Sequence, residues 1–173
     1  MPLAKKLGLS RTSFYWHFRD REALLEAMIR RWEEKNTGNL VERTRLPATT
    51  ICGAVFHLYD CWVDDRLFDA RLDLAIRNWA RNDPGLQARL DHADAARKSA
   101  LIAMFERYDY APHDAETRAM TAIYTQIGYI SMRIEESLAY RLEKMPDYVE
   151  ALTGKTPTAE EIKTFMARHI TRV

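Results

Sequence analysis

Apolar residues recur every three or four positions through most of the chain, which is the pattern of amphipathic helices. The clearest case is REALLEAMIRRWEEK, residues 21–35, where arginine and glutamate lie opposite one apolar stripe. That stripe consists of Leu24, Leu25, Met28, Ile29 and Trp32. Asp20 is a suitable N-cap for this helix. We expect the helix to end before TGN, residues 37–39, because glycine disfavours helix interiors.

The same spacing predicts five more helices. They cover about residues 49–65, 67–81, 86–107, 115–144 and 159–172, and Thr158 or a neighbour caps the last one. Short segments of alternating valine and isoleucine, which would indicate strands, do not occur in the sequence. The fold class predicted is therefore all-α.

The segment LAKKLGLSRTSFYWHF, residues 3–18, reads as the end of one helix, a tight turn and a short second helix. Gly8 is suited to end the first helix and Ser10 to cap the second. Phe14 and Phe18 are four residues apart and face the core. The other side chains of the short helix form an outer surface able to reach bases and phosphates. This is the geometry of a helix-turn-helix whose second helix enters the major groove of DNA.

LAKKLGLSRTSFYWHFRDREALLEAM, residues 3–28, resembles the signature of TetR/AcrR-type transcriptional regulators. The likeness runs without a gap from Leu3 to about Trp32. LAIRNWARNDPGLQARLDHADAARKSAL, residues 74–101, gives weaker support, since it resembles the regulatory domain of some members. The resemblance implies a partial helix-turn-helix domain at 1–36, followed by a helical-bundle domain for ligand binding and dimerisation at 37–173.

The resemblance also assigns roles to residues. It implies DNA contacts by Arg11, Thr12, Ser13, Tyr15, Trp16, His17 and Arg21. A packed aromatic cluster is the alternative for Tyr15, Trp16 and His17, and the two interpretations are closest for Trp16. The family pattern has a complete first helix and most of a second before the position of Leu3. We therefore expect a truncated N-terminus that lacks roughly 30 residues.

For the body of the chain, the resemblance implies an effector pocket and a dimer interface. The pocket would be lined by Phe56, Tyr59, Trp62, Trp79, Met104 and Phe105, with His57 and His92 as polar groups. Such a wall suits a small hydrophobic or aromatic molecule. The interface of the homodimer would use Tyr124, Ile127, Gly128, Ser131, Ile162, Phe165 and Met166. Ordinary core packing is the alternative for each of these residues.

Charge adds a weaker argument. The net charge is +1, but residues 1–35 hold eight Lys or Arg against five Asp or Glu, which suits a polyanionic partner. The sequence has no apolar run of about 20 residues and no signal peptide, so we expect a cytoplasmic protein without a membrane span. Cys52 and Cys61 are expected to be buried thiols, because about 13 Å of helix separates them. The spacings typical of metal ligands do not occur, so we expect no metal and no cofactor.

Together these observations favour a ligand-responsive transcriptional repressor that binds a palindromic double-stranded DNA operator as a dimer and leaves it when a small molecule binds. The alternative is a helical ligand-binding dimer that has lost DNA binding through truncation. An all-helical enzyme is a third hypothesis, for which His57 with Asp60 is the only candidate pair. We therefore expect no catalytic residues.

Overall fold

The computed structural model describes residues 15–170, and every regular element in that range is a helix. The predicted all-α class is thus confirmed. The first helices are α3 (Arg21–Trp32), the π-helical segment η1 (Glu33–Gly38), α4 (Asn39–Arg45), α5 (Ile51–Val63) and α6 (Ala70–Ala80). They are followed by α7 (Pro84–Glu106), α8 (Pro112–Ser131), α9 (Leu138–Thr153) and α10 (Ala159–Ile170). None of these helices is both long and apolar enough to cross a membrane.

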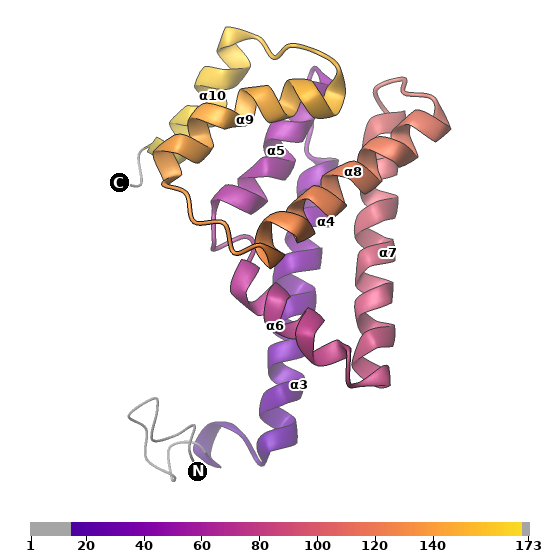
Figure 1. The fold of residues 1–173 in the computed structure, drawn as a ribbon, viewed down its shortest axis with the longest axis vertical. Helices are drawn as coiled ribbons and strands as arrows, with labels where there is room; N and C mark the ends of the chain where they lie inside the picture. Colours follow the sequence, from indigo (N-terminus) through magenta and orange to yellow (C-terminus); the bar gives the residue numbers. More distant parts are fainter. Residues whose placement is uncertain (1–14, 171–173) are drawn as a thin grey trace.

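Three of these elements, α3, η1 and α4, form one uninterrupted rod from Arg21 to Arg45. At 1.5 Å per residue the rod is about 37 Å long, and its start lies at the lower end of the molecule in Figure 1. The predicted break at residues 37–39 is wrong, since Gly38 keeps helical angles of φ −58° and ψ −54°. Tertiary contacts hold the chain here: Asn36 is fully buried and bonds both the backbone N–H and the carbonyl of Asp69. Packing overrides the weak helical preference of the TGN segment.

Most of the remaining helices lie where the periodicity predicts them. Asp20 caps α3 by accepting a hydrogen bond of 2.8 Å from the backbone N–H of Ala23. Thr158 and Glu161 form a reciprocal capping box at the start of α10. These local signals were readable in the sequence.

The single helix predicted for residues 115–144 is wrong. The structure has two helices there, because α8 ends at Ser131 and Arg133 takes the left-handed angle φ 53°. Ser137 then caps α9 by accepting from the N–H of Tyr140. Helix α9 continues through Pro146 to Thr153 and ends at Gly154, whose φ of 69° suits glycine.

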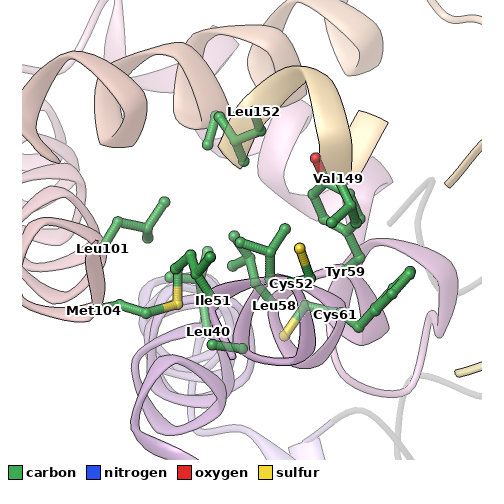
Figure 2. Packing of buried hydrophobic residues seen from close by; sticks show 14 of the residues in the cluster. Leu40, Ile51, Cys52, Leu58, Tyr59, Cys61, Leu101, Met104, Val149 and Leu152 are labelled. Atoms are coloured by element: carbon green, nitrogen blue, oxygen red, sulfur yellow. The ribbon is translucent and has the colours of Figure 1, made fainter. Parts of the chain in front are cut away.

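The main core lies between α4, α5, α7, α8, α9 and α10, and Figure 2 shows part of it. Cys52 and Cys61 are buried there and both are free, as predicted for the two thiols. Burial raises the pKa of the Cys61 thiol to about 12, so the thiol stays protonated at neutral pH. Their burial makes the two cysteines packing residues.

A second, smaller core joins the rod to α6 and α7. Trp32 of α3 is fully buried at its centre, and Ile29, Ile76, Ala80, Leu86, Leu90 and Ala93 complete the cluster. Burying a side chain of this size stabilises the fold by roughly 2–3 kcal/mol. Helix α3 is thus fixed to the body by its packing against α6 and α7.

Candidate DNA-contacting end and effector cleft

The N-terminal end of the described structure presents aromatic side chains to solvent. Residues 15–17 are helical, and Trp16 is 83% exposed, Tyr15 51% exposed and His17 exposed. Among the described residues, Trp16 is therefore exposed rather than packed in an aromatic cluster. Its ring contacts the His17 ring edge-on, at 5.0 Å between the ring centroids. Phe18 is half-buried, in line with its predicted inward direction.

Arg21, at the start of α3, is exposed beside this end. A tyrosine hydroxyl, an imidazole and a guanidinium can all donate hydrogen bonds to phosphate oxygens. The structure therefore places four of the predicted DNA-contacting residues on one accessible end: Tyr15, Trp16, His17 and Arg21. Arg11, Thr12 and Ser13 lie outside the described residues.

Behind this end, a buried polar cluster fixes the rod to α6 and α7. Asp73 of α6 is 1% exposed, and its Oδ1 accepts a hydrogen bond of 2.7 Å from Trp32 Nε1. The same oxygen accepts 3.2 Å bonds from both terminal nitrogens of Arg97, a residue of α7. Arg97 also donates from Nε to Thr37 of η1 at 2.9 Å. One carboxylate therefore connects three elements.

The charges of this cluster are balanced by more than one acid. Arg77 donates to Asp73 at 2.8 Å and makes two bonds of 2.7 Å to Asp94. Burial raises the pKa of Asp73, but the charges of Arg97 and Arg77 and the bond from Trp32 outweigh it, so that the pKa is lowered. Asp73 is thus held as a carboxylate. No sequence motif marks this cluster, because its members lie up to 65 positions apart.

A second link between the rod and α7 lies closer to the DNA-contacting end. Arg89 of α7 donates two bonds to Glu33, at 2.7 and 2.6 Å, and one of 2.7 Å to Glu26. All three side chains are partly exposed to water. The ion pairs therefore contribute less to the stability of the fold than their short distances indicate. Their bidentate geometry still fixes the direction of α3 along α7.

A third polar cluster surrounds Asp60 of α5 and includes residues of α4 and α10. Asp60 is 2% exposed and accepts from His169 Nε2 at 2.7 Å, from Arg168 at 3.1 Å and from Arg43 at 3.0 Å. His57 Nδ1 is 3.8 Å from the carboxylate. Asp60 thereby connects α5 to α4 and α10, so its contacts are structural rather than those of a His57–Asp60 pair.

Two adjoining cavities lie between α5, α6, α8 and α9. The larger has a volume of about 970 Å³, and the smaller, of about 70 Å³, shares Trp62, Gln126, Tyr129, Glu136 and Arg141 with it. We call the two together the effector cleft. Its apolar wall includes Phe68, Leu74, Ile130 and Ile134, and the smaller cavity adds Tyr59 and Tyr148. The volume and the mixture of aromatic and polar groups suit a small organic ligand.

The structure brings only two of the six predicted ligand residues to this cleft, Tyr59 and Trp62. Phe56, Met104 and Phe105 are almost fully buried in the main core, with exposed fractions of 2% or less. Trp79 packs against the smaller core beside Trp32. The prediction that all six gather in one pocket is therefore wrong. Side chains on the inward face of a helix can pack in the core instead of lining a cavity. His57 and His92 do not line the cleft either.

The predicted dimer residues lie on two separate helices. On α8, Tyr124 is 61% exposed, Ser131 is exposed, and Ile127 and Gly128 are half exposed. On α10, Ile162 and Met166 are half-buried against the main core. Phe165 is fully buried and stacks on Phe56 at 4.7 Å. A residue without free surface cannot meet a partner, so the assignment of Phe165 to the interface is wrong.

Comparison with known proteins gives one match. The family model described as bacterial regulatory proteins, tetR family, matches residues 2–28. No curated protein and no solved structure matches the chain. The matched segment includes the exposed aromatic residues at 15–17 and runs into α3, so its position agrees with the DNA-contacting end. This match supports a DNA-binding transcriptional regulator of the tetR family, with the similarity confined to residues 2–28.

Proposed function

We propose that this protein is a ligand-responsive repressor that binds a palindromic operator as a homodimer and leaves the DNA when a small molecule enters the effector cleft. The observation that carries the proposal is the structural connection between the DNA-contacting end and the effector cleft. The family segment at 2–28 runs into the rod, and α6 both contacts the rod and lines the cleft. The protein acts by binding, without catalysis.

Helix α6 supplies the physical link. Ala70, Arg71 and Leu74 line the larger cavity, while Asp73 and Arg77 face the rod and α7. A ligand that favours a different position of α6 therefore also changes the support of Trp32. The ligand acts on DNA binding only through its different affinities for the two states, as linkage requires.

The dimer uses the exposed face of α8. Tyr124, Ile127, Gly128 and Ser131 offer a surface on which a Cβ added at Gly128 would meet nothing within 4 Å. Ile162 and Met166 are half-buried on α10, and in this proposal they contribute their remaining exposed surface to the dimer. Two copies are needed because a palindromic operator requires two recognition helices about 34 Å apart.

The proposal is tested by selecting ligands from a pool of random DNA duplexes and measuring their affinities in mobility-shift assays. We expect an enriched palindrome, and we expect Tyr15→Ala and Arg11→Ala to weaken its binding at least tenfold. Tyr140→Ala and Arg81→Ala are matched controls, since Tyr140 is 47% exposed on α9 and Arg81 is exposed at the end of α6. Variants at 11 and 15 that bind like the controls would refute the DNA-contact assignment. A pool without enrichment would favour the ligand-binding dimer that does not bind DNA.

A further inference from the structure

We infer that the effector cleft binds a planar aromatic acid, whose ring system lies against Trp62 and Tyr129 and whose anionic group lies between Arg71 and Arg133. The inference rests on the proposed function in taking this cleft as the effector site. It adds the charge and the hydrogen-bonding pattern of the ligand.

The aromatic part follows from the rings that line the cleft. Tyr59 and Trp62 lie 4.9 Å apart at an interplanar angle of 36° and continue along the wall to Tyr129 and Tyr148. Rings in such arrangements favour another flat ring by stacking or edge contact. An aliphatic ligand would gain only the free energy of burying its apolar surface. The wall therefore favours a ligand with a planar aromatic ring system.

A buried donor within this wall has no partner. Trp62 Nε1 is out of contact with solvent and makes no hydrogen bond to any residue in the range 15–170. An unsatisfied buried N–H carries a free-energy penalty, and an acceptor oxygen on the ligand would remove it once a rotation of the indole brings the N–H to the surface of the cleft. The cleft therefore favours a ligand that bears a carbonyl or carboxylate oxygen next to its ring.

The charge of the ligand follows from the arginines. Three arginines line the larger cavity against two glutamates. Arg141 is engaged, since it donates to the carbonyl of Trp62 and lies over the ring of Tyr129 at 5.5 Å. Glu136 is also engaged, because it accepts from the Tyr129 hydroxyl at 3.0 Å.

Arg71 and Arg133 form no ion pair with any residue that the structure describes, so their guanidinium groups are available to a ligand. Arg71 reaches the cleft from the first turn of α6, and Arg133 from the turn after α8. Guanidinium groups bind carboxylates through paired hydrogen bonds. An anionic ligand is therefore favoured over a cationic one, which would meet this excess of positive charge.

The test uses 2-naphthoate and its uncharged analogue 2-naphthamide as probes, measured by isothermal titration calorimetry on the 173-residue chain. Both probes offer a carbonyl oxygen to Trp62, but only the acid offers a charge to the arginines. We expect naphthoate to bind one site per chain and at least tenfold more tightly than naphthamide. The double variant Arg71→Gln/Arg133→Gln should remove that preference.

Two control variants separate the contributions. Arg81→Gln removes an exposed arginine outside the cleft and should bind both probes like the parent. Trp62→Phe keeps a ring but removes the donor, so it should weaken both probes to the same extent. Circular dichroism verifies that each variant keeps its helices.

The inference is refuted if naphthoate fails to bind at millimolar concentration, if the two probes bind equally, or if the double variant binds naphthoate like Arg81→Gln. These readouts do not involve DNA. A protein that binds naphthoate through Arg71 and Arg133 but selects no duplex would retain the inference and refute the proposed repressor.

Discussion

Trp32 on the rod donates its indole N–H to Asp73 on α6 over 2.7 Å, and both side chains are almost fully buried. Forty-one positions separate the two residues, and the bond joins α3, into which the family segment runs, to the helix that lines the effector cleft. Arg97 contacts both partners, through hydrogen bonds to Asp73 and through its position 5.2 Å from the Trp32 ring centre. This pair therefore connects α3 directly to the helix that lines the effector cleft.

Replacing Trp32 with phenylalanine tests the strength of this link. Phe keeps a ring beneath Arg97 but removes the N–H and part of the buried volume. A hydrogen bond to a charged group contributes about 1.5–3 kcal/mol, and the remaining gap adds to the loss. We expect the free energy of unfolding in urea to fall by about 2–4 kcal/mol.

Trp79→Phe is the matched control, because Trp79 is half-buried at the edge of the same cluster. It should cost about 1 kcal/mol or less, as a partly exposed ring loses little packing. Equal losses for the two variants would mean that the bond to Asp73 contributes nothing measurable.

Asp73→Asn should be at least as destabilising, on average, as Trp32→Phe. The substitution leaves Arg97, whose side chain is 4% exposed, without its nearest countercharge. Removing one partner of a buried ion pair costs about 3–5 kcal/mol. Asp94 Oδ1 lies 3.4 Å from Arg97 Nη1 and remains as a countercharge, so we expect a loss of stability near the lower end of this range.

A double-mutant cycle with Arg97→Gln measures the coupling between the two residues. Because the second substitution removes the charge that the first leaves unpaired, the double variant should lose at least 1 kcal/mol less than the sum of the single losses in urea unfolding. Strict additivity would show that Asp73 and Arg97 stabilise the fold independently.

Features set by neighbouring residues could be predicted from the sequence. The Asp20 cap, the capping box of Thr158 with Glu161, and the helical periodicity all depend on residues within about four positions. The exposed direction of Tyr15 and Trp16 was predictable as well, since it follows from Phe18 facing inward on a short helix.

Features set by distant residues could not be predicted. Gly38 stays helical because Asn36 is fixed by Asp69, 33 positions away. Helix periodicity identifies an inward face but does not distinguish a core from a cavity, which is why Phe105 was assigned to a pocket and lies in the core. Arg71 and Arg133, by contrast, carry no sequence signal, since exposed arginines are common on helices.

Asp60 provides a prediction about pH. Burial by itself raises the pKa of Asp60, but the hydrogen bond from His169, the nearby imidazole of His57 and the charge of Arg168 outweigh it and lower the pKa below its ordinary value of 3.8. Because the folded pKa is lower than the unfolded one, the unfolded state binds more protons in acid, and stability rises with pH there. The contribution of Asp60 is complete above about pH 5 and is lost as the pH falls toward the folded pKa.

Asp60→Asn should therefore reduce the pH dependence of stability. Urea unfolding between pH 3 and 5 should show a slope shallower than that of the parent by up to about 1 kcal/mol per pH unit. Leu58→Ala is the control, since Leu58 is fully buried on the same helix and its loss lowers stability without removing a carboxylate. An Asp60→Asn slope equal to that of Leu58→Ala would contradict the lowered pKa.

Arg21 provides a prediction about DNA binding that needs no operator sequence. A side chain that neutralises one phosphate releases about 0.9 counterion, so its removal lowers the salt dependence of affinity for any duplex by that amount. We expect Arg21→Gln to reduce the slope of log K against log salt by about 1, measured by fluorescence anisotropy on a 30-base-pair random duplex. Arg31→Gln is the matched control, because Arg31 is exposed on the same helix three turns farther from the DNA-contacting end. Equal slopes for both variants would place Arg21 away from the phosphates, while an equal reduction in both would show a diffuse charge effect along α3.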